Sequence, residues 1–144
     1  MTAQARAKAT NGAPQLKNRA LFRQQCYVDG HWTAAMDGAT IDVTNPATGA
    51  LIGTIPALGA AATEAAVAAA SAAFPAWATR TAKERGGLLR RWYELLIEHA
   101  DDIATLMTAE QGKPLAEARG EVVYAASFVE WFAEEAKRLY GDII

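Results

Sequence analysis

The fold of this chain is decided by a junction between two predicted helices, Met107-Thr108-Ala109-Glu110-Gln111-Gly112-Lys113-Pro114-Leu115-Ala116-Glu117-Ala118. Glycine is the residue that most often ends a helix in the left-handed conformation, so Gly112 is placed just after the last helical turn. Proline fits the first turn of a helix, because the N–H that it lacks has no intrahelical partner there. The stretch therefore predicts a short helix before Gly112 and a second helix that begins at Pro114.

The second helix, about residues 114–140, carries apolar side chains on two sides. One stripe contains Val122, Ala126, Val129, Phe132, Ala133 and Ala136, and the other contains Tyr124, Phe128 and Trp131. A helix with two apolar stripes needs cover on two sides. The helices upstream can cover one stripe, which predicts that further protein or an oligomer interface covers the other.

Two more helices are predicted before the junction. Residues 62–74 are mostly alanine, the strongest helix former, and Pro75 is expected to stop or kink that helix. Thr81 and Glu84 fit a capping box, in which each side chain satisfies a free backbone N–H at the start of a helix. The helix behind the box is predicted to bury one apolar face, made of Leu88, Leu89, Trp92, Leu95 and Leu96.

A small antiparallel β region is predicted at about residues 26–56, followed by three or four helices at about 60–140. Asp29-Gly30 supplies the positive φ angles of a type I′ turn, so the segments on either side of it form a tight hairpin. Residues 41–44 alternate with period two and are expected to pair with residues 51–55 across an Asn-Pro-containing turn.

Charge is distributed unevenly along the chain. The first 23 residues hold five basic side chains and no acid, so the rest holds nine basic and 16 acidic residues, a net charge of −7. We predict a disordered basic leader at residues 1–20, because it is too polar to offset the entropy of ordering and lacks the apolar stripe of a transit peptide. The acidic remainder argues against nucleic-acid binding, and no apolar run reaches the roughly 20 residues of a membrane helix. A single cysteine is consistent with a reducing compartment, so we expect a cytoplasmic protein.

No side-chain pattern in the sequence forms an active site by itself. It contains no G-x-G-x-x-G or phosphate loop and no metal-ligand spacing of Cys or His. In the predicted hairpin Cys26 and His31 share a face and could generate a thiolate, but a single strand cysteine is more often a small core residue. A structural role is also favoured over chemistry for His99, Asp101, Asp102, Lys113 and the charged cluster from Glu130 to Arg138.

Three stretches resemble the aldehyde dehydrogenase superfamily in their order and spacing. They are Asn45-Pro46-Ala47-Thr48-Gly49 with Ile55-Pro56, then Thr81 to Trp92, and then the long stretch from Met107 to Asp142. The third stretch is the most specific and is most similar to the NAD(P)-dependent succinate-semialdehyde dehydrogenase branch, with the glutarate-semialdehyde enzymes close behind. The resemblance implies that residues 21–144 are an incomplete N-terminal piece of that family's α/β fold, truncated before the catalytic domain.

The resemblance also implies the chemistry of the complete enzyme. In that family a cysteine attacks the aldehyde, hydride passes to NAD or NADP, and a water activated by glutamate hydrolyses the thioester. The family's nucleophile, base and cofactor loop follow the last helix seen here. No catalytic, cofactor-binding or metal-binding residue is therefore assigned, no cofactor is expected to bind this chain, and Cys26 is not the family nucleophile. Tyr124 and Phe128 are candidates for the wall of the aldehyde tunnel, with ordinary core packing as the alternative.

Two functional hypotheses follow. The first is an N-terminal fragment of an NAD(P)-dependent oxidoreductase that converts an aldehyde, succinate semialdehyde, to succinate, in a family whose members are usually homo-oligomers. This hypothesis expects the isolated fragment to be inactive. The alternative is a short helical interaction module that binds a partner protein, such as a full-length dehydrogenase subunit, through its last helix.

Overall fold

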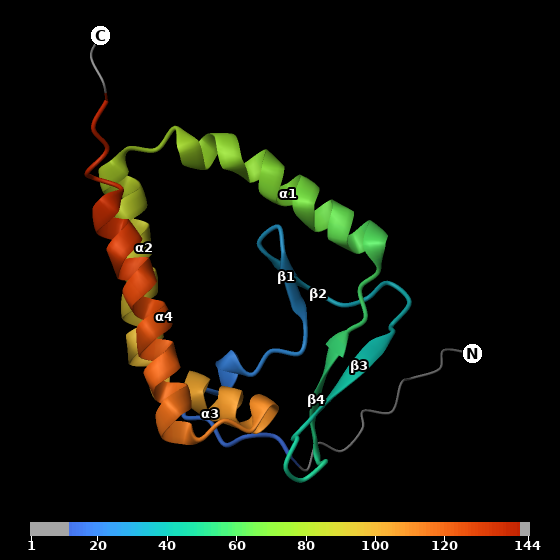
Figure 1. Cartoon of the computed structure of the whole chain (residues 1–144). Helices are drawn as coiled ribbons and strands as arrows, with labels where there is room; N and C mark the ends of the chain where they lie inside the picture. The colour runs from blue at the N-terminus through green and yellow to red at the C-terminus, as the bar shows by residue number, and fades with distance from the viewer. Residues whose placement is uncertain (1–11, 142–144) are drawn as a thin grey trace.

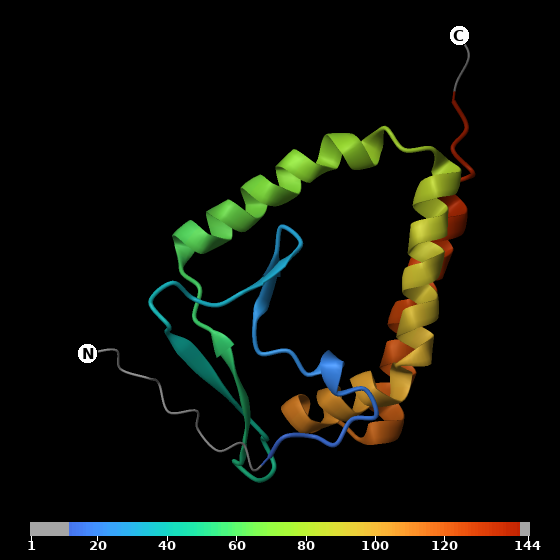
Figure 2. The ribbon, with the colours of Figure 1, turned by 180° about the vertical axis from the view of Figure 1, so that it is seen from behind.

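The computed structural model describes residues 12–141, whose elements follow the predicted order of a small antiparallel β region and then helices. In chain order they are the 3-10 turn η1 (Arg19–Leu21), the strands β1 (Cys26–Val28), β2 (His31–Thr33), β3 (Thr40–Thr44) and β4 (Leu51–Pro56), and the helices α1 (Ala60–Ala78), α2 (Ala82–Glu98), α3 (Ala100–Gln111) and α4 (Leu115–Glu135). Helix α1 arches from β4 to α2, and α2 and α4 lie side by side (Figures 1 and 2).

The strands form two separate antiparallel hairpins, as predicted. In β1–β2, Val28 pairs with His31, and the two turn residues between them, Asp29 and Gly30, have φ angles of 49° and 78°. Both angles are positive, as a type I′ turn requires. In β3–β4 the register is regular from Thr40 to Val43 and shifts before Thr44, which is where the chain enters the turn.

The helices α2, α3 and α4 form the packed part of the molecule. Helices α2 and α4 meet at Gly86, where an added Cβ would lie 2.8 Å from the carbonyl oxygen of Ala133. Helices α3 and α4 meet through a buried cluster of small residues, with Ile103 and Met107 packed against it: Ala100, Ala104, Ala118 and Val122. Small side chains let the helix backbones approach closely, so the core is tight although few of its side chains are large.

The buried side of α2 differs from the predicted apolar face. Gly86 is buried and Leu89 and Leu96 are half-buried, as expected for the last two. The other three members of that face, Leu88, Trp92 and Leu95, are exposed. The reason is that α2 approaches α4 most closely at Gly86. With Gly86 facing α4, the larger apolar residues of α2 point away from α4.

The predicted boundaries of α1 and α4 shift. Helix α1 passes Pro75 and ends at Ala78, because the turn after the proline is still closed by a hydrogen bond from the Thr79 N–H to the Pro75 carbonyl. Helix α4 ends at Glu135 rather than near residue 140, since the N–H groups of Lys137 and Arg138 bond to carbonyls only three residues back. At the junction, Gly112 ends α3 with a φ of 79°, as predicted, and α4 begins at Leu115, one residue after the predicted start at Pro114.

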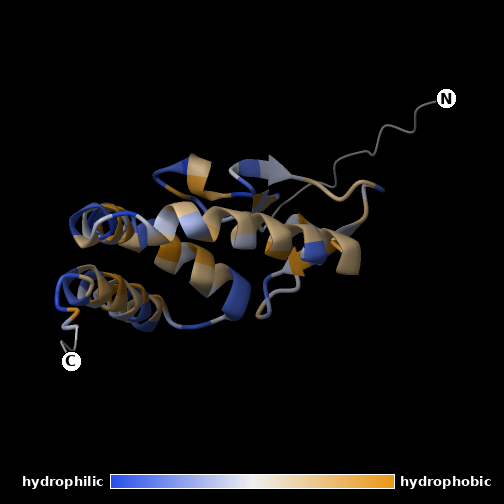
Figure 3. Cartoon of the chain, turned by 90° about the horizontal axis from the view of Figure 1, so that it is seen from above, coloured by the Kyte–Doolittle hydropathy of each residue, from blue (hydrophilic) through white to orange (hydrophobic). Residues whose placement is uncertain are grey.

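Helix α1 is the least packed element. It buries none of its residues, although it is apolar along most of its length (Figure 3). Its large apolar side chains Val67 and Phe74 are exposed. Helix α1 therefore connects the hairpins to the packed helices covalently and contributes little to holding them together.

Of the predicted basic leader, residues 1–11 lie outside the described residues. The remainder follows a defined path across the molecule. The Gly12 N–H bonds to the Leu51 carbonyl of β4, and the Lys17 and Asn18 N–H groups bond to the carboxylate of Asp102 on α3. The donors in these contacts are backbone N–H groups, which nearly every residue has. The residue types of the segment therefore could not predict the contacts.

Candidate functional site

The two residues predicted to line a substrate tunnel lie together on α4. Tyr124 and Phe128 are one helical turn apart, and their ring centroids are 4.9 Å from each other at an interplanar angle of 81°. This edge-to-face arrangement is favourable for aromatic rings, so each ring holds the other in place. Tyr124 and Phe128 are 65% and 48% exposed, so neither is buried within the described part of the chain.

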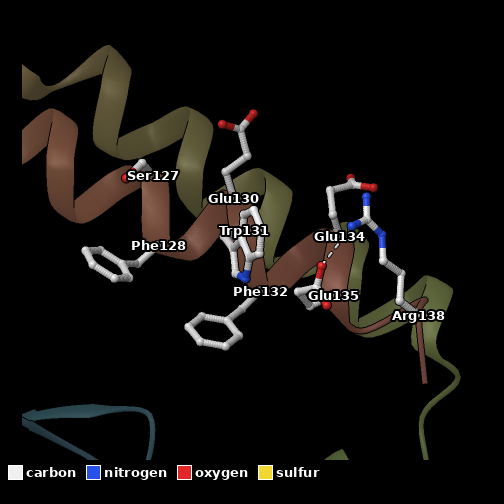
Figure 4. A pocket seen from close by; sticks show the side chains of 8 residues that line it. All are labelled: Ser127, Phe128, Glu130, Trp131, Phe132, Glu134, Glu135 and Arg138. Carbon is white, nitrogen blue, oxygen red and sulfur yellow. Dashed lines mark hydrogen bonds and ion pairs between the residues drawn. The ribbon is translucent and has the colours of Figure 1, made fainter. Parts of the chain in front are cut away.

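These two rings belong to a larger apolar surface, which we call the α4 aromatic face and define by four residues: Tyr124, Phe128, Trp131 and Phe132. Trp131 and Phe132 are 61% and 60% exposed. Phe132 was predicted to share a stripe with the buried Val122 and Ala126, but it points away from α2 together with Phe128 (Figure 4). The helix thus buries a side of small residues and presents a side of large ones.

A hollow of about 520 Å³ lies over the C-terminal half of this face. Phe128, Trp131 and Phe132 form its apolar part, and the remaining lining is polar: Ser127, Glu130, Glu134, Glu135 and Arg138. Contiguous exposed apolar surface of this kind marks a surface that another protein segment or a ligand covers.

The charges around the hollow are already paired. Arg90 of α2 donates to Glu130 at 2.6 Å, Lys137 to Glu134 at 3.2 Å and Arg138 to Glu135 at 3.0 Å. Desolvation acts to lower the pKa of Arg90, but its hydrogen bonds to Glu130 and Glu94 raise that pKa overall. The rim therefore offers no unpaired charge among these six groups, and the chemistry of the hollow is that of an apolar surface.

The pair of residues that could have formed a nucleophile lies elsewhere. Cys26 and His31 fall on the same face of β1–β2, as the register requires. Cys26 is half-buried and its carbonyl accepts a hydrogen bond from the Thr33 hydroxyl, while His31 is exposed. Neither residue lines the hollow on α4.

The other sequence candidates have structural partners. His99 lies between α2 and α3, as the residue that ends the one and precedes the other. The pKa of Asp102 is lowered mainly by hydrogen bonds from the Asn18 and Lys17 N–H groups. Asp102 is only 5% exposed and accepts backbone N–H groups, an arrangement that sequence reasoning missed because its partners lie 84 and 85 residues away. Lys113 forms an ion pair with Glu121. Within residues 12–141 no group of three metal-ligating side chains is placed to hold an ion.

The described residues do not fit a dinucleotide cofactor. The single connection from a strand to a helix in residues 12–141 runs from β4 to α1, and it contains one glycine, Gly59. A dinucleotide site of the usual kind needs a glycine-rich turn so that the backbone can approach the pyrophosphate. None of their helices has the length and apolar character to cross a membrane.

Comparison with known proteins finds aldehyde dehydrogenases that match most of the chain. The aldehyde dehydrogenase family matches residues 32–144. Glutarate-semialdehyde dehydrogenase of Pseudomonas putida is 65% identical over 130 residues, which are 90% of this chain and 27% of that protein. The succinate-semialdehyde dehydrogenase [NADP(+)] GabD of Escherichia coli is 58% identical over the same shares of the two chains.

A solved structure matches in three dimensions as well. The crystal structure of an aldehyde dehydrogenase from Brucella melitensis biovar abortus has a TM-score of 0.87 and 61% identity, and the match covers 90% of this chain and 27% of that chain. The hairpins and helices described above are thus an N-terminal piece of that larger fold. This chain spans about 27% of the length of the curated relatives that it matches.

Proposed function

This chain belongs to the aldehyde dehydrogenase family, and we propose that it acts as the N-terminal scaffold of an NAD(P)-dependent enzyme that oxidises a semialdehyde. The observation that carries this proposal is the identity of 58–65% with succinate- and glutarate-semialdehyde dehydrogenases across 130 residues. This identity covers 90% of the chain, so it supports the reaction class of these relatives, oxidation of an aldehyde, as well as their fold.

The α4 aromatic face is the part of this scaffold that meets the rest of the enzyme. In this proposal Tyr124 and Phe128 form a wall of the passage through which the aldehyde reaches the catalytic domain. Two features support the role: the rings are mutually oriented at 81°, and both are accessible in the chain described here. A rigid apolar wall would orient the carbon chain of a semialdehyde without bonding to its polar ends.

We assign no catalytic group of this reaction to residues 12–141. The chain's one cysteine lies in the β1–β2 hairpin, and the α4 hollow is lined by aromatic rings, by Ser127 and by charges that are already paired. We therefore propose that the isolated 144-residue chain is inactive. Incubation with succinate semialdehyde and NAD or NADP should give no formation of the reduced cofactor above the background rate. Turnover above that background would contradict this part of the proposal.

A chimeric enzyme tests the proposal directly. The segment of the Pseudomonas putida glutarate-semialdehyde dehydrogenase that matches this chain would be replaced by this chain, with the parent enzyme as the reference. The chimera should oxidise succinate or glutarate semialdehyde, and the formation of reduced cofactor measures the rate. A folded chimera that binds the cofactor but oxidises neither semialdehyde would contradict the proposed function.

The same chimera tests the tunnel wall. Phe128→Ala should raise KM for the semialdehyde more than it lowers kcat, because the ring contacts the substrate chain rather than the reacting atoms. Leu115→Ala is the control, since Leu115 is also exposed on α4 but lies in its first turn, outside the aromatic face. An equal KM for the two variants would contradict the proposal that Phe128 lines the aldehyde passage.

The exposed α4 aromatic face also supports the second candidate, a helical module that binds a partner protein such as a dehydrogenase subunit. Mixing the chain with the intact Pseudomonas putida enzyme distinguishes the two functions. A module forms a stable complex by size-exclusion chromatography and loses it when Trp131 and Phe132 are changed to glutamine. A scaffold does not bind the intact enzyme, because the matching surface of that enzyme is already covered by its own segment.

A further inference from the structure

The segment at residues 12–24 touches two elements that are far from it in sequence, the strand β4 and the helix α3. At one end the Gly12 N–H donates to the Leu51 carbonyl at 3.0 Å. At the other end the side-chain oxygen of Gln24 accepts the Thr54 N–H at 2.8 Å. Both contacts are on β4, so the segment leaves the hairpin β3–β4 and returns to it.

Between these two ends the segment is held by helix α3. One carboxylate oxygen of Asp102 accepts the Lys17 N–H at 2.9 Å, and the other accepts the Asn18 N–H at 2.8 Å. The carboxylate is 5% exposed, and each of its oxygens has a backbone donor. Charge-assisted bonds of this kind are stronger than neutral ones, and a buried N–H left without a partner is costly.

The surrounding contacts orient the segment but are weaker. The Lys17 ammonium lies 3.3 Å from Asp101, whose other oxygen accepts from Arg119 at 2.9 Å. These three groups are more than half exposed, and ion pairs at that exposure contribute little to stability. The Asn18 side chain accepts the Ala20 N–H at 3.0 Å and so starts the turn η1 directly after the Asp102 contact.

The segment also supplies packing. The ring of Phe22 lies over Gly53 of β4, where an added Cβ would be 2.9 Å from the Cζ atom of the ring. Phe22, Ile52 and Glu110 of α3 line one small hollow, so the phenyl ring lies where the hairpin meets the helix. Direct contact between β3–β4 and the helices occurs at Pro46, whose Cγ lies 3.1 Å from the position of a Cβ on Gly112.

We propose that residues 12–24 form a strap that couples the β3–β4 hairpin to the helices α2–α4, with Asp102 as its anchor. Helix α1 cannot provide this coupling, because it buries none of its residues. The strap is therefore the main non-covalent tie between the two parts, and its release lets the hairpin open while the helices stay packed. This device does not depend on the enzymatic function proposed above.

Hydrogen exchange of the full 144-residue chain tests the strap. Asp102→Asn keeps the size of the side chain but replaces one carboxylate oxygen by an amide nitrogen. That nitrogen cannot accept a hydrogen bond, so either the Lys17 or the Asn18 N–H loses its partner. Exchange at Lys17, Asn18 and Thr54 should become about tenfold faster, as expected for a lost charged hydrogen bond. The amides of α2 and α4 should exchange at the rate of the unchanged chain.

Asp101→Asn is the matched control, because Asp101 is the neighbouring carboxylate and bonds only to exposed side chains. It should leave exchange at Thr54 unchanged. The strap is overturned if Asp102→Asn leaves the protection of β4 intact, or if α2 and α4 lose protection to the same extent as β4.

A second variant keeps the test decisive if Asp102→Asn fails to fold. Removal of residues 1–18 takes away the strap's contact with α3 and leaves Asp102 in place. The far-UV circular dichroism of the helices should persist, and β4 should again exchange about tenfold faster. Unchanged exchange of β4 in this shortened chain would also overturn the proposal.

Discussion

Gly86 of α2 lies against the backbone of α4 so closely that a Cβ at this position would be 2.8 Å from the carbonyl oxygen of Ala133. Real Cβ atoms do not approach a carbonyl oxygen to this distance, so the two helices could not keep their separation around any other residue. This contact sets which side of α2 is buried, and hence which apolar residues of α2 and α4 remain exposed.

Gly86→Ala should therefore destabilise the chain by about 1–3 kcal/mol, the usual effect of overpacking a tight contact. Thermal unfolding followed by circular dichroism measures the change. The next residue offers a matched control, since Gly87 lies in the same helix with open space around it. Gly87→Ala should stabilise the chain by about 0.5–1 kcal/mol through the higher helix propensity of alanine. Equal effects of the two substitutions would contradict the close contact.

Gly112→Ala should lower stability by about 1–2 kcal/mol, because Gly112 has a φ of 79° and a side chain is strained in the left-handed region. The new methyl group would also approach Pro46, 3.1 Å away. Gly120→Ala is the control inside α4, where nothing lies near and φ is not positive, and it should be neutral or stabilising. The measurement is the midpoint of denaturant unfolding for the three chains.

Acid should release the strap before it unfolds the helices. The hydrogen bonds from the Asn18 and Lys17 N–H groups lower the pKa of Asp102, with smaller contributions from the charges of Lys17 and His99. The carboxylate thus has a lower pKa folded than unfolded, where it is about 3.9. Its stabilising effect is present above that value and is lost as the pH falls through the folded-state pKa.

The measurement for this prediction is hydrogen exchange at Thr54 between about pH 2 and pH 6, corrected for the intrinsic rate of exchange. In the unchanged chain protection of Thr54 should fall at the acid end of this range. In Asp102→Asn, which lacks the ionisable group, that fall should be absent. The same pH dependence in both chains would show that another carboxylate controls the hairpin.

The α4 aromatic face should make the isolated chain self-associate, since exposed aromatic surface of this extent is unfavourable in water. Size-exclusion chromatography at increasing concentration measures the effect. Changing Phe128 and Trp131 to glutamine should restore a monomer without lowering the unfolding temperature, because both side chains are about half exposed or more. Val122→Ala is the contrasting change: Val122 is 3% exposed, so its truncation should lower stability and leave association unchanged.

Much of the local structure could be predicted from the sequence, because its causes lie within a few residues. The Asp29-Gly30 turn has the positive φ angles that its residue types favour. Thr81 and Glu84 form both hydrogen bonds of the capping box. Gly112 ends α3 as its lack of a Cβ suggests. The excess of apolar surface on the last helix was predictable for the same reason, since helical periodicity assigns side chains to faces without knowledge of the neighbours.

Only the tertiary structure decided which of those faces is buried and how the two parts of the chain are tied together. Leu88 and Leu89 are equally apolar neighbours, yet only Leu89 is half-buried, because the contact between Gly86 and Ala133 fixes the rotation of α2. The sequence indicates only a structural role for Asp102, and its two backbone partners lie 84 and 85 residues earlier. A backbone N–H is the same in almost every residue, so no residue type in the leader could have indicated where it would bind.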